Sequence, residues 1–377
     1  MKISLLVSDF AENCLGRAYI LAKMLESTFE VEVIGPLFGE KIWFPCNTNE
    51  FVYKPVRCVP TFPHFFKSMG KILHLITGDI IYASKPWFTS FGIGILGKLQ
   101  RKKPLILDID DWELGWYLPY RFRKMVSLTL RTIFDVNGFL NTCFLEKMTF
   151  LTDGVTTASK FLQDRFGGVY IPHARDTQVL DPHKYNGDKL KREWDLKGKK
   201  IIMFLGSAKP HKGIGDILQA LKLLHRDDVK LVIIGSTNSR FAKEEIPRES
   251  ISSLVIKGMI SFCRVPEYLA CSDLVVIPQN NVPSNFAQVP AKLFDAMAMA
   301  KPIVSTRISD MPEILEDCGF IVDPDNPRDL AEKIDYILTN PVEAKEIGEK
   351  ARERCIREYS LEVVGQRLIS YIQKASQ

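Results

Sequence analysis

The sequence of 377 residues has no long apolar run. The nearest approach to a membrane span, residues 86–97, is glycine-rich and shorter than the roughly 18 to 20 apolar residues that cross a bilayer. The apolar run at the N-terminus is brief and interrupted by Asp9, which fits a buried strand better than a secretion signal. We therefore expect a cytoplasmic protein without a transmembrane helix.

The eight cysteines form no Cys-x-x-Cys pair and no short metal-ligand spacing, and the histidines show no ligand spacing either. For such a pattern we expect reduced structural thiols, no metal site and no cofactor. The net charge of +5 is modest and neither half shows a nucleic-acid reading module, so we expect no nucleic-acid partner. The 46% of apolar and 25% of charged residues are typical of a soluble globular protein.

Short apolar runs alternate with helical patterns along the whole chain, which is typical of parallel α/β sheets. The length suits two domains, each with its own core. We therefore predict two doubly wound, Rossmann-like domains. The predicted strands are residues 3–7, 31–34, 80–83, 105–107, 155–157 and 169–172 in the first half, and 201–205, 231–234, 254–257, 274–277, 303–305 and 320–322 in the second.

Residues 173–199 are polar, contain Pro and Gly, and have no apolar period, as is typical of a connection between domains. The prediction is an N-terminal domain of residues 1–175 and a C-terminal domain of residues 176–377. Near the end of the chain, residues 341–373 show one long amphipathic helical pattern.

The stretch from residue 278 to residue 313 is the most informative for function. A buried strand ends at Pro278, a polar loop follows, and Pro290 suits the first turn of a helix. Such a unit places loop N–H groups and the positive end of a helix at the carboxyl edge of a parallel sheet, where anions bind. Asp295 lies in the first turns of that helix, and one carboxylate there can accept hydrogen bonds from two ribose hydroxyls.

At these residues the chain resembles the family 4 glycosyltransferases, whose C-terminal domains carry a Glu, seven residues, a second Glu, an Ala-Met-Ala helix and a Pro-Val-Val strand. Here the second acidic position is Asp295, followed by AMAMAKPIVST, but the first is Ala287. The segment PAKLFD is similar to a variant of the family that also lacks the first Glu. The resemblance implies the two-lobed GT-B fold with a central cleft, and a final helix that packs back on the N-terminal domain.

Residues 201–215 predict a strand that ends at Gly206, a short loop and a second helix. Lys209 and Lys212 on this loop would reach a diphosphate, where positive charge stabilises a departing anion. We assign Lys212 to catalysis as well as to donor binding.

The resemblance implies the rest of the donor site. Family members carry an arginine where this chain has Ser207, so Lys209 or Lys292 would supply a second cation beside Lys212. Loop N–H groups would hold the sugar hydroxyls, a strand end of the second half would line the base pocket, and the first N-terminal loop would approach the phosphates. The corresponding residues are Asn285, Phe286, Ala287 and Gln288 for the sugar, Lys257, Gly258 and Met259 for the base, and Gly16 for the phosphates.

Four carboxylates cluster where an N-terminal strand is predicted to end, at Asp108, Asp110, Asp111 and Glu113. Their mutual repulsion would raise at least one pKa. Asp110 and Asp111 stand where the family has His-Asp, and we predict that they contact acceptor or donor hydroxyls, with Asp110 catalytic. Two alternatives stay open: an Asp-x-Asp metal site at Asp108 and Asp110, and an acidic helix start without function.

Basic and aromatic residues interleave in residues 54–103 and 115–134. The first segment has nine basic residues and one acidic residue, Asp79. Such segments suit anionic lipid head groups, each basic side chain contributing on the order of 1 kcal/mol near the surface. The hypothesis is peripheral attachment to the inner face of the cell membrane. The alternative is an ordinary core helix with solvated basic faces.

The predicted function is a retaining glycosyltransferase that moves a sugar from a nucleoside diphosphate sugar to a lipid-linked or saccharide acceptor in glycan biosynthesis. Without the family's first acidic residue, front-face displacement needs the fewest protein groups, because the departing phosphate helps to deprotonate the acceptor. A nucleotide-sugar epimerase of similar fold stays open, since the Asp110 cluster offers acid and base groups. A noncatalytic scaffold stays open because of Ala287 and Ser207.

Overall fold

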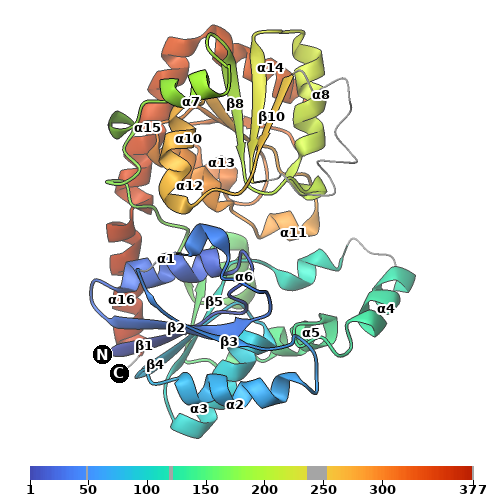
Figure 1. The fold of residues 1–377 in the computed structure, drawn as a ribbon, viewed down its shortest axis with the longest axis vertical. Helices are drawn as coiled ribbons and strands as arrows, with labels where there is room; N and C mark the ends of the chain where they lie inside the picture. The colour runs from blue at the N-terminus through green and yellow to red at the C-terminus, as the bar shows by residue number, and fades with distance from the viewer. Residues whose placement is uncertain (48–49, 119–121, 236–252, 376–377) are drawn as a thin grey trace. The chain divides into compact units, whose positions relative to one another are not determined.

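The computed structural model describes residues 1–47, 50–118, 122–235 and 253–375. They form two compact units, which we describe one at a time. Unit 1 comprises Met1–His173 and Leu361–Gln377, and unit 2 comprises Ala174–Ser360 (Figure 1). The first boundary between the units follows His173, whereas the sequence analysis placed it after residue 175.

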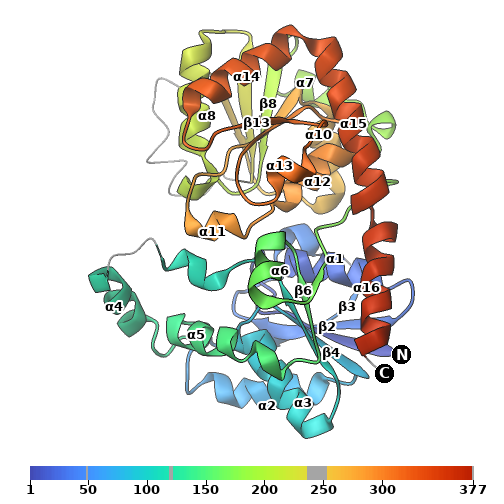
Figure 2. The same ribbon diagram turned by 180° about the vertical axis from the view of Figure 1, so that it is seen from behind.

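Unit 1 is built around a seven-stranded parallel sheet. Its strands are β1 (Lys2–Leu6), β2 (Glu30–Leu37), β3 (Val52–Arg57), β4 (Ile80–Ser84), β5 (Leu105–Ile109), β6 (Gly154–Thr157) and β7 (Val169–Tyr170). Its helices are α1 (Leu15–Leu25), α2 (Phe65–Leu75), α3 (Ile93–Arg101), α4 (Phe122–Arg131), α5 (Phe139–Lys147), α6 (Lys160–Phe166) and α16 (Leu361–Ala375), with short turns η1 (Phe44–Cys46), η2 (Phe88–Gly92), η3 (Glu113–Trp116) and η4 (Thr149–Leu151). The strand order is β3-β2-β1-β4-β5-β6-β7, with α1 and α16 on one face and α2 and α3 on the other (Figures 1 and 2).

Unit 2 is built around a six-stranded parallel sheet. Its strands are β8 (Lys200–Leu205), β9 (Val229–Ile234), β10 (Leu254–Lys257), β11 (Leu274–Ile277), β12 (Ile303–Thr306) and β13 (Phe320–Val322). Its helices are α7 (Asp188–Glu193), α8 (Ile214–Leu224), α10 (Val265–Ala270), α11 (Pro283–Phe286), α12 (Ala291–Ala298), α13 (Met311–Ile314), α14 (Pro327–Thr339) and α15 (Pro341–Tyr359), with short turns η5 (Pro182–Lys184), η6 (Pro210–Lys212) and η8 (Phe262–Arg264). The strand order is β10-β9-β8-β11-β12-β13.

Burial on both faces explains why the strands read as continuous apolar runs. Along β8, Ile201, Met203 and Leu205 belong to one hydrophobic core, while Ile202 and Phe204 belong to another. Because neighbouring side chains of a strand point to opposite faces, both faces of the sheet carry a core. The predicted doubly wound architecture therefore follows from the apolar pattern.

Two elements differ from the sequence-based expectation. Strand β3 was not predicted, because it is a partly exposed edge strand that contains Lys54 and Pro55. The single long helix predicted for residues 341–373 is wrong: it is two helices, α15 and α16, separated at the extended residue Ser360. Ser360 instead forms a parallel bridge with Arg175, where the Arg175 N–H donates to the Tyr359 carbonyl at 3.0 Å.

Helix α16 belongs to unit 1, where it lies beside α1. The Val155 N–H at the start of β6 donates to the Tyr371 hydroxyl at 3.0 Å. No helix in the described ranges has the length and apolar character needed to span a bilayer.

The strand order changes direction at one place in each sheet. In unit 1 this place lies between β1 and β4, and in unit 2 it lies between β8 and β11. Ligands of open α/β sheets bind at the carboxyl ends of the strands that flank such a switch point. The loops after these four strands are therefore the places to search for a site.

Candidate functional site

The loop after β8 in unit 2 closes on the loop after β11. It contains Gly206 and Gly213, which both have a positive φ, at 109° and 69°. A Cβ on Gly213 would overlap the carbonyl oxygen of Pro278, the first residue after β11. Glycine is required here by its backbone conformation and by the close approach of the second loop.

Asparagine side chains join the same two loops by hydrogen bonds. The Gly213 N–H donates to Oδ1 of Asn280 at 3.0 Å, and the Asn280 N–H donates to the His211 carbonyl at 3.1 Å. The Asn285 Nδ2 donates to the carbonyls of His211 and Asn280 at 2.7 and 2.9 Å. The loops after β8 and β11 thus form one connected structure at the switch point.

Two lysines approach each other at this place. Lys292, in the first turn of α12, has its Nζ 3.5 Å from the centroid of the Phe204 ring on β8. Burial, together with the nearby charge of Lys212, lowers the pKa of Lys292 well below its ordinary value. An anionic ligand would favour the protonated form of Lys292, because it would offset both the burial of this lysine and the nearby charge of Lys212. Lys209 is exposed and Ser207 partly buried on the same loop.

Asp295 lies one helical turn beyond Lys292 on α12, and its carboxylate pairs with Arg175. The Arg175 Nε donates to Oδ1 and its Nη2 donates to Oδ2 at 3.2 Å, a fork-like arrangement. The Asp295 side chain keeps 16% of its surface exposed. Arg175 was missed in the sequence analysis, because it precedes Asp295 by 120 residues and no local pattern connects the two.

The switch point of unit 1 holds a compact ionic cluster around Lys85, which follows β4. The Lys85 Nζ lies 3.0 Å from Asp110, 2.7 Å from Asp111 and 2.8 Å from Glu113, and all four side chains are largely buried. Lys85 also has a φ of 73°, which is uncommon for a residue other than glycine. The sequence analysis found the carboxylates and missed their common partner.

The charges of this cluster shift several pKa values. Burial raises the pKa of Asp110, against the opposing charge of Lys85. Burial likewise raises the pKa of Glu113 to about 7. The three carboxylates raise the pKa of Lys85 well above its ordinary value despite its burial. Three carboxyl groups share one ammonium, so the cluster can hold a proton near neutral pH.

Asp108 pairs with Arg17, whereas the other three carboxylates pair with Lys85. Its Oδ1 and Oδ2 accept hydrogen bonds from Arg17 Nη2 and Nε at 2.7 and 2.9 Å, and Oδ1 also accepts from Thr156 at 2.8 Å. Asp108 is fully buried. The alternative of an Asp-x-Asp metal site with Asp110 is therefore disfavoured, because Arg17 already compensates the charge of Asp108.

Comparison with known proteins decides the family of unit 2. Residues 187–354, which include both loops of the switch point, match the family described as glycosyl transferases group 1. This segment is similar to the group 1 glycosyltransferase domains. The resemblance seen in the sequence around Asp295 is thereby confirmed.

The curated relatives of this chain are distant. An uncharacterized glycosyltransferase of Methanocaldococcus jannaschii is 24% identical over 58% of this chain and 58% of its own length. The alpha-D-kanosaminyltransferase of Streptomyces kanamyceticus is 24% identical over 48% of this chain and 47% of its own length. The chain thus spans about half the length of these curated relatives.

Solved structures match the whole chain in fold. The crystal structure of Anabaena HepE in complex with UDP and glucose covers 99% of both chains with a TM-score of 0.75 and 16% identity. Together with the two parallel sheets, this confirms the predicted GT-B fold of two doubly wound domains.

The segment predicted to offer N–H groups to the sugar has fewer available N–H donors than expected. Residues 283–286 form helix α11, and the N–H groups of Asn285, Ala287 and Gln288 donate to Val282 and Asn285 carbonyls. For these three residues the prediction of free donors is wrong, because a turn of helix satisfies them. Ala287 is also fully buried. Phe286 remains partly exposed at the end of α11.

Backbone groups of the predicted base pocket and of Gly16 also take part in hydrogen bonds within the chain. The carbonyls of Lys257 and Gly258 accept from the Gly235 N–H at 2.9 and 3.1 Å, while Met259 is largely exposed. Residues 236–252, which precede β10, lie outside the described residues. In unit 1, the Gly16 N–H donates to the Asn13 carbonyl at 3.0 Å in the first turn of α1.

The basic and aromatic segment of residues 54–103 is only partly exposed. Lys85, Phe65 and Phe91 are buried in unit 1. Lys54 pairs with Glu32 at 2.6 Å and Lys98 pairs with Asp153 at 2.7 Å. Phe66, in contrast, is 53% exposed, and Lys67 and Lys71 are exposed on the same helix, α2. Attachment of this segment to a membrane therefore stays a prediction.

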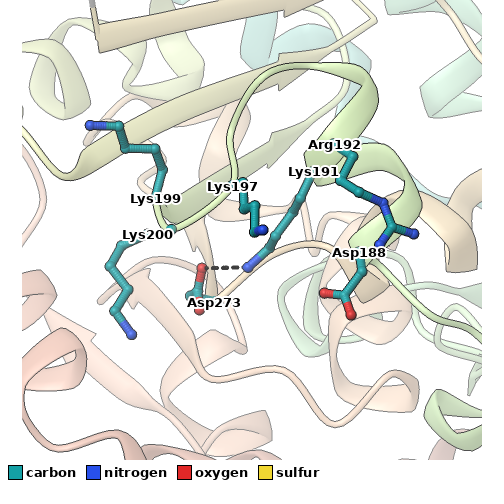
Figure 3. A pocket seen from close by; sticks show the side chains of 8 residues that line it. Asp188, Lys191, Arg192, Lys197, Lys199, Lys200 and Asp273 are labelled. Atoms are coloured by element: carbon teal, nitrogen blue, oxygen red, sulfur yellow. Dashed lines mark hydrogen bonds and ion pairs between the residues drawn. The ribbon is translucent and has the colours of Figure 1, made fainter.

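A cavity of about 380 Å³ lies at the opposite edge of the unit 2 sheet (Figure 3). It is lined by Asp188, Lys191, Arg192, Lys197, Gly198, Lys199, Lys200 and Asp273. Figure 3 shows Lys191 reaching toward Asp273, and the Nζ to Oδ2 distance is 3.3 Å. Because Lys200 begins β8, this cavity is at the amino end of the strand, remote from the switch-point loops at its carboxyl end.

The ionic cluster gives a pH prediction for folding. A carboxyl group whose pKa is raised in the folded state stabilises the fold at low pH, and this contribution is lost as the pH rises. For Glu113 the loss should run from pH 4.5, its ordinary pKa, to about 7. We expect Glu113→Gln to reduce the fall in the free energy of unfolding between pH 5 and pH 8, by up to about 3 kcal/mol.

Urea unfolding of both proteins at several pH values measures this difference. The control is Glu343→Gln, a change of an exposed carboxylate in unit 2. An identical pH dependence in Glu113→Gln and the unchanged protein would contradict the role given to Glu113.

Proposed function

We propose that the protein transfers a sugar from a nucleoside diphosphate sugar to a hydroxyl group of an acceptor. The observation that carries the proposal is the approach of Lys212 and Lys292 at the β8–β11 switch point. Two neighbouring cations at the carboxyl edge of a parallel sheet suit a diphosphate. The group 1 glycosyltransferase domain and the UDP and glucose in HepE support this donor class.

In this proposal each part of the donor has a partner in unit 2. Lys212 and Lys292 hold the diphosphate, and the adjacent Gly206 loop allows its close approach. Asp295 accepts hydrogen bonds from the ribose hydroxyls. The strand end at residues 257–259 lines the base.

The proposed reaction retains the configuration of the sugar. The bond between the anomeric carbon and the diphosphate oxygen breaks, and the acceptor oxygen bonds to the same face of that carbon. The acceptor proton passes to the departing phosphate oxygen, while Lys212 and Lys292 stabilise the new negative charge. This route needs no carboxylate at the family's first acidic position, which in this chain is the buried Ala287.

Asp110 and Asp111 are proposed to receive acceptor hydroxyls. Both keep part of their side chains exposed while they pair with Lys85. The raised pKa of Asp110 allows this carboxyl group to exchange a proton nearer to neutral pH than a solvated aspartate. Asp110 is the proposed catalytic carboxyl group.

Loss of Lys212 should remove activity. We expect Lys212→Ala to lower the rate of sugar transfer about 100-fold, because one charged contact to the departing diphosphate disappears. The measurement is nucleoside diphosphate release with a panel of donors and acceptors. Lys345→Ala is the control, since Lys345 is an exposed lysine of α15 with no place in the proposed site.

Two other outcomes would contradict the proposal. Equal donor turnover in Lys212→Ala and the unchanged protein would favour a noncatalytic scaffold. Conversion of the donor sugar to its epimer without an acceptor would favour an epimerase.

Donor binding should take up a proton. Because the pKa of Lys292 is well below its ordinary value, a bound diphosphate that favours the ammonium form raises it again. Affinity for a nucleoside diphosphate should therefore fall as the pH rises. Titration calorimetry in buffers of different ionisation enthalpy measures the proton uptake, which Lys292→Met should abolish. The control is Lys333→Met, which should leave the uptake unchanged, because Lys333 is a lysine of α14 with its Nζ 5.8 Å from the centroid of the Phe320 ring.

We also propose that the acceptor is lipid-linked and that unit 1 binds an anionic membrane surface. Helix α4 stands apart from the sheet of unit 1, beyond α5 (Figures 1 and 2). Lys124, Arg131 and Lys147 are exposed around it. The exposed large apolar side chains of this region, which we call the α4–α5 surface, are Leu118, Val126, Leu130, Ile133, Phe134, Leu140, Phe144 and Phe150.

The α4–α5 surface carries both elements of an interfacial contact, apolar area and positive charge. Its buried Glu146 contributes little negative charge to the exposed face. Contiguous apolar surface of this kind is uncommon on a protein without a binding partner. Anionic lipid head groups match the exposed lysines and arginine.

Vesicle sedimentation tests the membrane proposal. We expect Leu130→Ser with Phe134→Ser to lower the fraction bound to anionic vesicles at low salt at least several-fold, because about 0.8 kcal/mol is lost for each buried CH₂ group. Val342→Ser, which removes an exposed apolar side chain of unit 2, is the control. Equal binding of all three proteins, or no binding to anionic vesicles by any, would overturn the proposal.

A further inference from the structure

We propose that Arg175 is a positioning residue that orients the Asp295 carboxylate for the ribose of the donor. The inference rests on the proposed function, and it adds a residue that neither the motif nor the family assignment supplies. Arg175 lies two residues into unit 2, outside the 187–354 segment that matches the family. Its guanidinium nevertheless reaches α12.

The Arg175 side chain is fixed by bonds at each of its nitrogens. Nε and Nη2 donate to the two oxygens of Asp295, Nη2 also donates to the Ala291 carbonyl at 2.8 Å, and Nη1 donates to the Ala174 carbonyl at 2.8 Å. Only 9% of the side chain is exposed. A planar guanidinium held this way has one orientation, so it imposes one orientation on the carboxylate.

The Asp295 carboxylate keeps room for a ligand in this pair. An ionised carboxylate offers about four acceptor positions, and Arg175 occupies two of them. The exposed 16% of the side chain leaves a path for hydroxyl donors. Arg175 compensates the charge of this partly buried carboxylate, which without that partner would be free to turn toward solvent.

The bond to Ala291 extends the same support to the diphosphate site. Ala291 is the first residue of α12, and Lys292 follows it. One guanidinium therefore braces the helix turn that carries the proposed diphosphate ligand and the carboxylate proposed for the ribose. The specific contribution of Arg175 to ribose recognition is its contact with Asp295.

A second buried arginine provides a matched control. Arg352 donates to the carbonyls of Ala298, at the last residue of α12, Leu180 at 2.6 Å and Thr177 at 3.2 Å. Like Arg175 it braces α12 through backbone carbonyls, but its recorded bonds do not include Asp295. A purely structural role should make the two arginines equivalent.

The test compares ribonucleotides with analogues that lack the hydroxyl groups. Titration calorimetry measures the dissociation constants of UDP, GDP and ADP and of their 2′,3′-dideoxy forms for the unchanged protein, Arg175→Met, Arg352→Met and Asp295→Asn. The readout is the ratio of the two constants for the nucleotide that binds. For the unchanged protein we expect a preference of about 10-fold or more for the ribonucleotide, the size expected for hydrogen bonds to a charged group.

Arg175→Met should reduce this preference to within about twofold, as should Asp295→Asn, whereas Arg352→Met should keep it. Arg175→Lys should restore part of it, and it replaces Arg175→Met if that variant does not fold. Suppose that Asp295→Asn loses the preference for the ribonucleotide while Arg175→Met, or Arg175→Lys in its place, keeps it in full. This result would overturn the inference about Arg175 and leave the proposed donor site standing. An unchanged preference in Asp295→Asn, or no binding of any of these nucleotides, would overturn the proposed donor site and the inference with it.

Discussion

The close contact between the loops after β8 and β11 is the constraint on which the donor half of the structure depends. Gly213 allows it, because any side chain there would overlap the carbonyl of Pro278. The contact brings the lysine of one loop near the lysine that begins α12. Neither lysine alone would define a diphosphate site, since single surface lysines are common.

The two units use charge in opposite ways at their switch points. In unit 2, Lys212 and Lys292 repel each other, which prepares the place for an anion. In unit 1, three carboxylates surround Lys85, and burial raises the pKa of two of them, Asp110 and Glu113. Both arrangements shift pKa values, and strongly shifted pKa values are common at functional sites. Proton balance is therefore expected to matter in both units.

Much of the fold was predictable from the sequence, because buried parallel strands leave long apolar runs. Strand β3 was missed since Lys54 and Pro55 at a sheet edge lack that signal. The acidic cluster was found from adjacent residues, but its partner Lys85 comes from another strand and had been assigned to a surface. The fork between Arg175 and Asp295 joins segments 120 residues apart, which no local period can reveal.

The paired segments at Arg175 and Ser360 have a topological meaning. Unit 2 is a continuous stretch of chain whose two ends lie side by side, while unit 1 is assembled from two separate stretches. In this sense unit 2 is an insertion into unit 1, a connection that folds tolerate when the ends of the inserted part are neighbours. Unit 1 is thus completed only when residues Leu361–Gln377 have been synthesised, whereas all residues of unit 2 have emerged before them.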